Sequence, residues 1–312
     1  MAVPAAKYPS QSGHVEVMGH RIHYVEHGTG APVLFLHGNP TSSYMWRDVL
    51  PHVANQTGRR GIALDLLGFG QSDKPRDVRY TLDLHARVVQ EFVNALGLRD
   101  IVLVADDWGG PLGMHDVVER SERYQAAILM ETFLWTFTFV DDFDPKFRMP
   151  FRLMRGPMGF FFVQVLNMMT KKVIPEHCPI TDEGLQSYLD SMPTIRSRLA
   201  MRDFVRLNPL HGKPTPSVEF IDRIRAGLPR LRVPVTWLKA RPGVVPSDDY
   251  PPSLKKLEEL TRLMPQMLLK DFGPGHHFLA EENPSRVVEL VVEAIRERTP
   301  APAGAGRGTV VA

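Results

Sequence analysis

The regular alternation of short apolar runs with helix patterns restricts the fold of this chain more than any other feature. Within the first 131 residues the apolar runs are Val33–His37, Gly61–Asp65, Ile101–Ala105 and Ala126–Met130. Helix patterns separate them near Tyr44–His52, over Leu82–Leu96 and from Trp108 to Arg120. Runs this short and this apolar are typical of strands that are buried on both faces. Strands joined through helices pair in parallel, so we expect an α/β chain with a doubly wound, mostly parallel central sheet flanked by helices.

The alternation fails in the middle of the chain and then resumes. Between Leu134 and Gly212 the pattern is helical, rich in Phe, Met and Arg, and without a strand-like run, which we interpret as an inserted helical lid. Helix patterns then follow at Pro216–Ala226, Ser253–Met264 and Ser285–Arg296, and strand patterns at Val233–Lys239 and Gln266–Asp271. The predicted division is a first core part at 1–133, a lid at 134–213, a second core part at 214–298 and a disordered tail at 299–312.

Composition excludes several classes of protein. The 312 residues are 43% hydrophobic, which suits one large α/β domain with an insertion. Lys and Arg total 37 against 35 Asp and Glu, without a long basic run, so nucleic acid is not an expected partner. The single cysteine, Cys178, excludes an intramolecular disulfide. Neither a signal-peptide pattern nor a run of about 18 apolar residues occurs, so we expect a cytoplasmic protein without a membrane partner.

The segment Ala105–Gly110 places an aspartate where a strand turns sharply into a helix. Small residues flank Asp107 on both sides, at Ala105 and at Gly109 and Gly110, as a tight strand-to-helix turn requires. Such a turn exposes one side chain at the carboxyl edge of the sheet, beside a helix N-terminus that favours an anion. A carboxylate in this position can attack carbon and form an ester. Asp is also a favoured N-cap, so the local sequence alone leaves a purely structural role open.

A histidine and a second carboxylate follow later strands and could serve such a nucleophile. The Gly-rich segment after the last predicted strand contains His276 and His277, and we favour His277 as the base. Glu131 directly follows the run that ends at Met130, and therefore belongs at the same rim of the sheet as Asp107. The competing acids, Asp248 and Asp249, come late in the loop after Val233–Lys239, which favours Glu131.

Two uncharged donors add a feature that an esterase with a serine nucleophile does not need. Asn39 lies in His37-Gly38-Asn39-Pro40 directly after a predicted strand, and Trp108 follows Asp107. Their backbone N–H groups could form an oxyanion hole. Their side-chain amide and indole N–H groups could together hold a halide anion, although either residue alone has an ordinary structural explanation.

Five motifs together resemble those of the haloalkane dehalogenases. These motifs are His37–Trp46, Asp65–Pro75, Asp107–Gly110, Met130-Glu131 and Gly273–Pro284. The resemblance covers nearly the whole chain outside the predicted lid and tail. The branch of the family that uses a Glu after the sixth strand as its acid is the best match.

The resemblance implies an α/β-hydrolase fold and a role for each residue. Asp107 would be the nucleophile, His277 the base and Glu131 its partner, while Asn39 and Trp108 would hold the halide. Asp107 would displace halide to give an alkyl ester, which water activated by His277 would hydrolyse to an alcohol. The implied partners are a small apolar halogenated substrate, water and the halide ion, and no metal or organic cofactor is needed.

One residue departs from the family pattern. The family usually has His immediately before the nucleophile, whereas this chain has Asp106. Two carboxylates that lie close together raise the pKa of at least one of them. Alternation along the strand should point Asp106 away from the pocket, so we expect a structural role for it.

Three other functions remain compatible with these residues. An epoxide hydrolase would share the fold, Asp107 and His277, but such enzymes typically use two lid tyrosines, and Tyr188 is the only Tyr between Leu134 and Gly212. The luciferase that uses coelenterazine resembles the dehalogenases at nearly all these positions. A ligand receptor without catalytic activity is also possible, because fold does not fix function.

Overall fold

The computed structural model describes residues 11–299 of the chain. The predicted disordered tail, 299–312, therefore lies outside the described residues except for Thr299. Within residues 11–299, every helix is too short or too polar to cross a bilayer.

Eight strands form one central sheet, in the order β1-β2-β4-β3-β5-β6-β7-β8. The strands are β1 (Gln11–Val17), β2 (His20–His27), β3 (Pro32–Leu36), β4 (Arg60–Leu64), β5 (Ile101–Asp106), β6 (Tyr124–Met130), β7 (Val235–Pro242) and β8 (Leu268–Gly275). Strand β2 pairs antiparallel with β1 and β4, and every later pairing is parallel. The expected mostly parallel, doubly wound sheet is confirmed.

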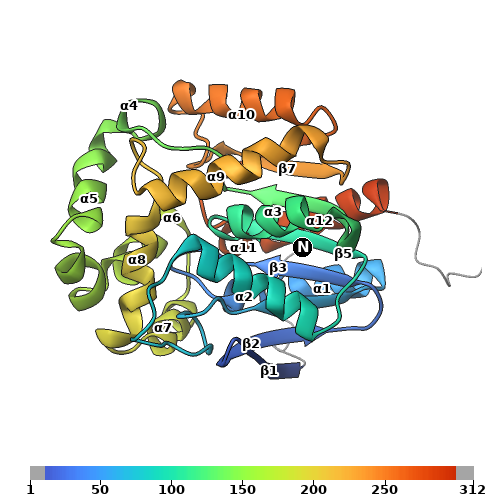
Figure 1. Ribbon diagram of the computed structural model, residues 1–312, viewed down its shortest axis with the longest axis horizontal. Coiled ribbons are helices and arrows are strands. Elements are labelled where there is room, and N and C mark those ends of the chain that lie inside the picture. The colour runs from blue at the N-terminus through green and yellow to red at the C-terminus, as the bar shows by residue number, and fades with distance from the viewer. Residues whose placement is uncertain (1–10, 300–312) are drawn as a thin grey trace, which may run out of the picture.

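Helices cover both faces of this sheet. One face carries α1 (Leu50–Thr57) and α12 (Pro284–Arg298), which contact each other. The other carries α2 (Leu82–Ala95), α3 (Gly109–Glu119) and α9 (Thr215–Gly227), which Figure 1 shows in front of the strands. A further helix, α10 (Pro251–Leu263), connects β7 to β8. Where the sequence predicted one helix near 44–52, the chain forms a 3₁₀ turn at Ser43–Trp46 before α1.

Local sequence signals account for the ends of these helices. Thr81 caps α2, because its hydroxyl accepts a hydrogen bond from the backbone N–H of Leu84 at 3.1 Å. Asp83 lies in the first turn, where the helix dipole favours a negative charge. The helix ends before Gly97, whose φ of 61° is left-handed backbone that favours glycine. The run Leu82–Ala95 therefore begins and ends as the sequence predicts.

The segment between β6 and β7 contains helices and short helical turns instead of strands. Its helices include α4 (Phe139–Asp142), α5 (Pro145–Arg155), α6 (Ile174–His177), α7 (Asp182–Ser191) and α8 (Leu199–Leu207), and two π-helical stretches, η3 (Phe160–Val165) and η4 (Met169–Val173). Only isolated bridges join Phe137, Leu210 and Lys213. Figure 1 shows α5, α7 and α8 gathered at one end of the molecule.

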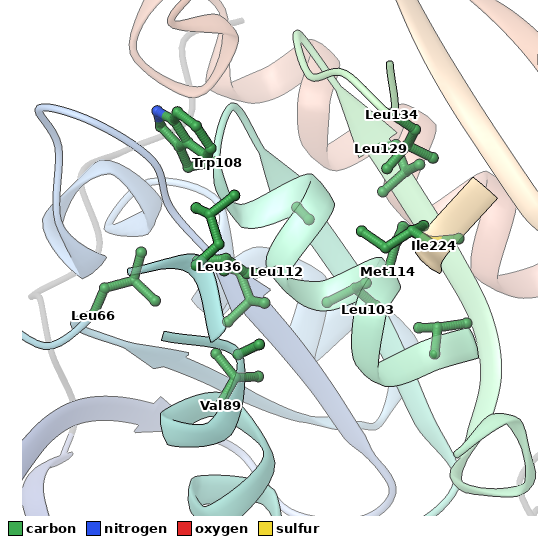
Figure 2. Packing of buried hydrophobic residues seen from close by; sticks show 14 of the residues in the cluster. Leu36, Leu66, Val89, Leu103, Trp108, Leu112, Met114, Leu129, Leu134 and Ile224 are labelled. Atoms are coloured by element: carbon green, nitrogen blue, oxygen red, sulfur yellow. The ribbon is translucent and has the colours of Figure 1, made fainter. Parts of the chain in front are cut away.

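Two hydrophobic clusters fill the spaces on either side of the sheet. Strand β5 contributes to both, because its side chains alternate: Ile101 and Leu103 belong to one cluster, and Val102 and Val104 to the other. Figure 2 shows the first cluster, in which Leu36, Leu103 and Leu129 from the strands pack with Leu112 and Met114 of α3. The same alternation places Asp106 on the face of Val104, which packs toward α1 and α12.

We expect Leu103→Ala to destabilise the protein by about 2–5 kcal/mol, because the side chain is fully buried and its removal leaves a cavity. Urea unfolding would measure the loss. Leu269→Ala is the matched control: Leu269 is 49% exposed on β8, and its truncation should cost less than about 1 kcal/mol. Equal losses for the two variants would contradict the assigned core.

Candidate active site

Asp107 lies in the sharp turn between β5 and α3. Its φ of 47° is left-handed backbone, which is strained for a residue with a side chain. The turn depends on the neighbouring glycines: a Cβ on Gly38 would lie 2.1 Å from Asp107 Oδ1, and one on Gly110 would lie 1.9 Å from Thr132 Oγ1. Thr132 also donates a 2.5 Å hydrogen bond to the backbone carbonyl of Asp107. Small residues are therefore required here for close approach, as the motif predicts.

The loops after β3 and β5 meet where the strand order reverses. From β3 the chain passes through α1 to β4 on one side, and from β5 it passes through α3 to β6 on the other, so the direction of the strand order reverses between β3 and β5. Asn39 follows β3 at this point, and its backbone N–H donates to Asp107 Oδ1 at 2.7 Å. The side chain of Asp107 is 13% exposed. One of its oxygens is thus held by the backbone.

Glu131 follows β6 and points into the same rim. Its φ of 42° marks a second strained turn, and its side chain is 1% exposed. Glu131 Oε2 accepts hydrogen bonds from the backbone N–H groups of Val244 and Val245, at 2.8 and 3.0 Å. These residues belong to the loop after β7. That loop therefore supplies donors to the buried carboxylate.

His277, in the loop after β8, lies between the two carboxylates. Its Nε2 is 3.8 Å from Asp107 Oδ2, and its Nδ1 is 3.5 Å from Glu131 Oε2. Both separations are ion-pair distances and are longer than ordinary hydrogen bonds. The imidazole is 12% exposed. The structure therefore brings the three predicted side chains together, each from a different strand end.

The competing candidates lie elsewhere. The His276 side chain is 55% exposed and approaches Glu282, with 3.4 Å between Nδ1 and Oε2. Asp248 forms an ion pair with Lys239, with 2.8 Å between Nζ and Oδ1. Among the described residues, 11–299, neither side chain forms a hydrogen bond or an ion pair with Asp107.

The electrostatics of the three groups are coupled. Burial by itself lowers the pKa of His277, but Glu131, Asp107 and Asp106 outweigh it and raise this pKa to about 9. Burial raises the pKa of Asp107, while His277 and the backbone N–H groups of Asn39 and Trp108 oppose the rise. Burial likewise raises the pKa of Glu131 against the influence of His277. At neutral pH, in the absence of substrate, the imidazole is accordingly protonated between its acidic neighbours.

The two uncharged donors, Asn39 and Trp108, line the site beneath helix α8. Asn39 is 7% exposed, and its amide nitrogen donates to the carbonyl of Met201 in α8 at 3.3 Å. The Trp108 ring packs edge-on against Phe133 and Phe204, with centroids 4.9 and 5.3 Å away. In Figure 2 the indole nitrogen is on the side of the ring turned away from Leu36 and Leu112.

Several residues that contact the site were not found from the sequence. They are Thr132, Met201, Val244, Val245 and Glu282. Three of them contribute backbone groups, which carry no side-chain signature. Thr132 directly follows Glu131, and Glu282 lies in the final motif, so position alone could have drawn attention to those two. Within residues 11–299, no group of three or more His, Cys, Asp or Glu side chains is arranged to hold a metal ion.

Within residues 11–299, Asp106 is buried next to Asp107 without a hydrogen-bond partner. It is 1% exposed, and neither carboxyl oxygen has a partner within the described part of the chain. Burial raises its pKa well above the usual range; His277 opposes this effect, and Asp107, Glu131 and Glu282 add to it. A buried carboxyl without donors is most stable in its uncharged form. The surroundings of Asp106 therefore favour its uncharged form.

The sheet order and the strained turn after β5 define the protein as an α/β-hydrolase. The family model described as the alpha/beta hydrolase fold matches residues 31–173. A haloalkane dehalogenase of Agrobacterium fabrum is 34% identical over 280 residues, covering 89% of each chain, and one of Mesorhizobium japonicum is 32% identical over 300 residues, covering 94% of each. The crystal structure of the haloalkane dehalogenase DatA from Agrobacterium tumefaciens C58 superposes with a TM-score of 0.86 at 32% identity, covering 94% of this chain and 98% of that one.

A second solved structure agrees with this placement. The haloalkane dehalogenase DbeA from Bradyrhizobium elkani gives a TM-score of 0.85 at 28% identity, covering 92% of this chain and 98% of that one. The chain belongs to the haloalkane dehalogenase family. It is therefore an enzyme of the class of hydrolases that act on carbon–halide bonds, and the expectations of family and fold are confirmed.

We expect the free energy of unfolding to decrease less with rising pH in Asp106→Asn than in the natural protein. Because the folded state holds the Asp106 proton more tightly than the unfolded chain does, this carboxyl stabilises the fold less as pH rises above the ordinary carboxyl range. The stability of the variant relative to the natural protein should therefore rise between about pH 5 and about pH 7, by at most about 1.4 kcal/mol per pH unit. Urea unfolding at each pH would measure it. A constant difference would show that Asp106 ionises normally.

Proposed function

We propose that this protein hydrolyses haloalkanes to alcohols through a covalent ester on Asp107, with His277 as base and Glu131 as its partner. The observation that carries the proposal is the position of His277, 3.8 Å from Asp107 and 3.5 Å from Glu131. A nucleophile, a base and an orienting acid in contact are what covalent hydrolysis requires. The names of the relatives support the substrate class.

The first half-reaction forms the ester. Asp107 Oδ2 attacks the carbon that bears the halogen, and the carbon–halogen bond breaks with its electron pair leaving on the halide. Oδ1 stays bonded to the backbone N–H of Asn39. We propose that the indole N–H of Trp108 and the side-chain amide of Asn39 hold the departing halide. An amide nitrogen carries two hydrogens, and the bond to Met201 uses one, so the other is free to bind the anion.

The second half-reaction releases the alcohol. His277 Nε2 takes a proton from water while the water oxygen attacks the carbonyl carbon of Asp107. The bond between that carbon and the alkoxide oxygen then breaks, and the imidazolium gives its proton to the alkoxide. Asp107 is left as a carboxylic acid, which loses its proton to solvent and becomes a carboxylate again. Across both steps, haloalkane and water give an alcohol, a halide ion and a proton.

Formation of the ester changes the pKa of His277. In the resting site the charge of Asp107 helps to raise the pKa of His277 to about 9, a value at which the imidazole is protonated and cannot accept a proton from water. Alkylation removes the charge of Asp107. The pKa of His277 then falls, the imidazolium loses its proton to solvent, and the neutral imidazole can accept a proton from water in the hydrolysis step.

We also propose that residues 134–213 act as the lid of this site. Helix α8 contacts it through Met201 and Phe204, which meet Asn39 and Trp108. An apolar cover of this kind excludes bulk water and suits a small apolar halogenated substrate.

The hydrogen bonding of Tyr188 argues against an epoxide hydrolase. Its hydroxyl donates to Glu281 Oε1 at 2.6 Å, and Arg47 binds the same carboxylate. The one tyrosine between Leu134 and Gly212 is thus tied to a structural ion pair. It is not available to protonate an epoxide oxygen, which favours the dehalogenase.

We expect Asp107→Ala to abolish halide release from 1-bromobutane or 1,2-dibromoethane, by at least about 1,000-fold, because no other group can form the ester. Halide production followed by ion chromatography measures the loss. Asp77→Ala, which removes an exposed carboxylate, is the control and should retain full activity. If the natural protein releases no halide from a broad panel of bromoalkanes and chloroalkanes, the proposed function is wrong.

We expect His277→Ala to trap the alkyl ester. Asp107 can still be alkylated in this variant, but no base activates water, so mass spectrometry should show an alkyl adduct on the peptide that contains Asp107. His276→Ala removes the neighbouring imidazole and should turn over within about twofold of the natural protein. An unmodified peptide in His277→Ala, or an adduct in His276→Ala instead, would reverse the assignment of the base.

A further inference from the structure

The loop that carries His277 is held by a single carboxylate from the next helix. Glu282 Oε1 accepts a 2.9 Å hydrogen bond from the backbone N–H of His277, and Oε2 accepts a 2.8 Å bond from that of His276. The Glu282 side chain is 9% exposed. Two charge-assisted bonds to consecutive N–H groups fix both the position and the direction of the backbone at the base.

Glu282 is itself anchored on both sides. It closes the short helix α11 (Leu279–Glu282), where its backbone N–H donates to the carbonyl of Phe278 at 2.9 Å. Helix α12 begins directly afterwards, with Asn283 as its cap. The preceding residue, Glu281, binds Arg47 through both oxygens at 2.6 and 2.7 Å. The carboxylate of Glu282 is therefore a rigid support for the loop.

The base needs such a support. His277 reaches Asp107 and Glu131 at 3.8 and 3.5 Å and makes no short hydrogen bond to either. Those side chains therefore do not fix the ring by themselves. A small displacement of the loop would carry Nε2 away from the water that must attack the ester.

We propose that Glu282 is a positioning residue for His277 and that it serves the hydrolysis of the ester rather than its formation. This inference rests on the proposed function. Asp107 lies on a different strand end, and its attack on carbon does not require the loop to be in place. Water activation does require it, because the base must lie within reach of both water and ester.

The test compares Glu282→Ala and Glu282→Gln with the natural protein in single-turnover experiments on 1-bromobutane. We expect the alkylation rate, read from the first burst of halide, to stay within about twofold. Hydrolysis of the ester should slow by about 10- to 100-fold in Glu282→Ala, so the adduct on the Asp107 peptide accumulates. Glu282→Gln keeps the shape but loses one acceptor, and should show a smaller effect in the same step.

Glu281→Gln is the matched control, because it changes the adjacent carboxylate, which binds Arg47 and Tyr188 instead of the His277 loop. It should lower the unfolding temperature without accumulation of the ester. The inference is overturned if both Glu282 variants hydrolyse the ester at the natural rate, or if they slow both steps equally, as a loss of folded protein would. If the natural protein itself releases no halide, it is the proposed function that fails instead.

Discussion

The arrangement of one buried imidazole between two buried carboxyl groups is the interaction on which the site depends. Charges removed from water are costly unless they are paired, and within residues 11–299 none of the three groups forms an ion pair outside this set. Asp107 follows β5, Glu131 follows β6 and His277 follows β8. Only a parallel sheet brings those three strand ends to one rim, so the doubly wound topology is a precondition of the chemistry.

Backbone N–H groups bind and position the carboxylates of the site and of the loop that carries His277. The N–H groups of Asn39, Val244 and Val245 bind the two carboxylates, and those of His276 and His277 bind Glu282. Fixed backbone donors stabilise charge without reorganising during the reaction. The loops can approach closely because Gly38 and Gly110 have no side chain, and a Cβ at either position would clash with neighbouring atoms. The strain at Asp107 and Glu131 is held in place by these contacts.

Asp106 changes the charge of this site relative to the usual family pattern. An imidazole in that position could carry a positive charge, whereas burial raises the pKa of the Asp106 carboxyl and favours its uncharged form. The resting site therefore holds one imidazole among three buried carboxyl groups, and the pKa of His277 depends on the charge of each of them. The proposed cycle uses this balance: when Asp107 becomes an ester, one negative charge is lost, and His277 changes from an acid to a base.

The sequence by itself determined the alternation of strands and helices, the turn at Asp107 and the candidate set of Asp107, Glu131, His277, Asn39 and Trp108. It could do so because apolar periodicity and small residues at a tight turn are local signals. The tertiary structure then placed the favoured His277 between Asp107 and Glu131, and it left the His276 side chain 55% exposed. It also brought in Glu282 and the N–H groups of Val244 and Val245, since a backbone donor has no sequence signature until folding places it. Only the tertiary structure also showed that Asp106 is buried without a hydrogen-bond partner among the described residues, because burial depends on what the rest of the chain packs around a residue.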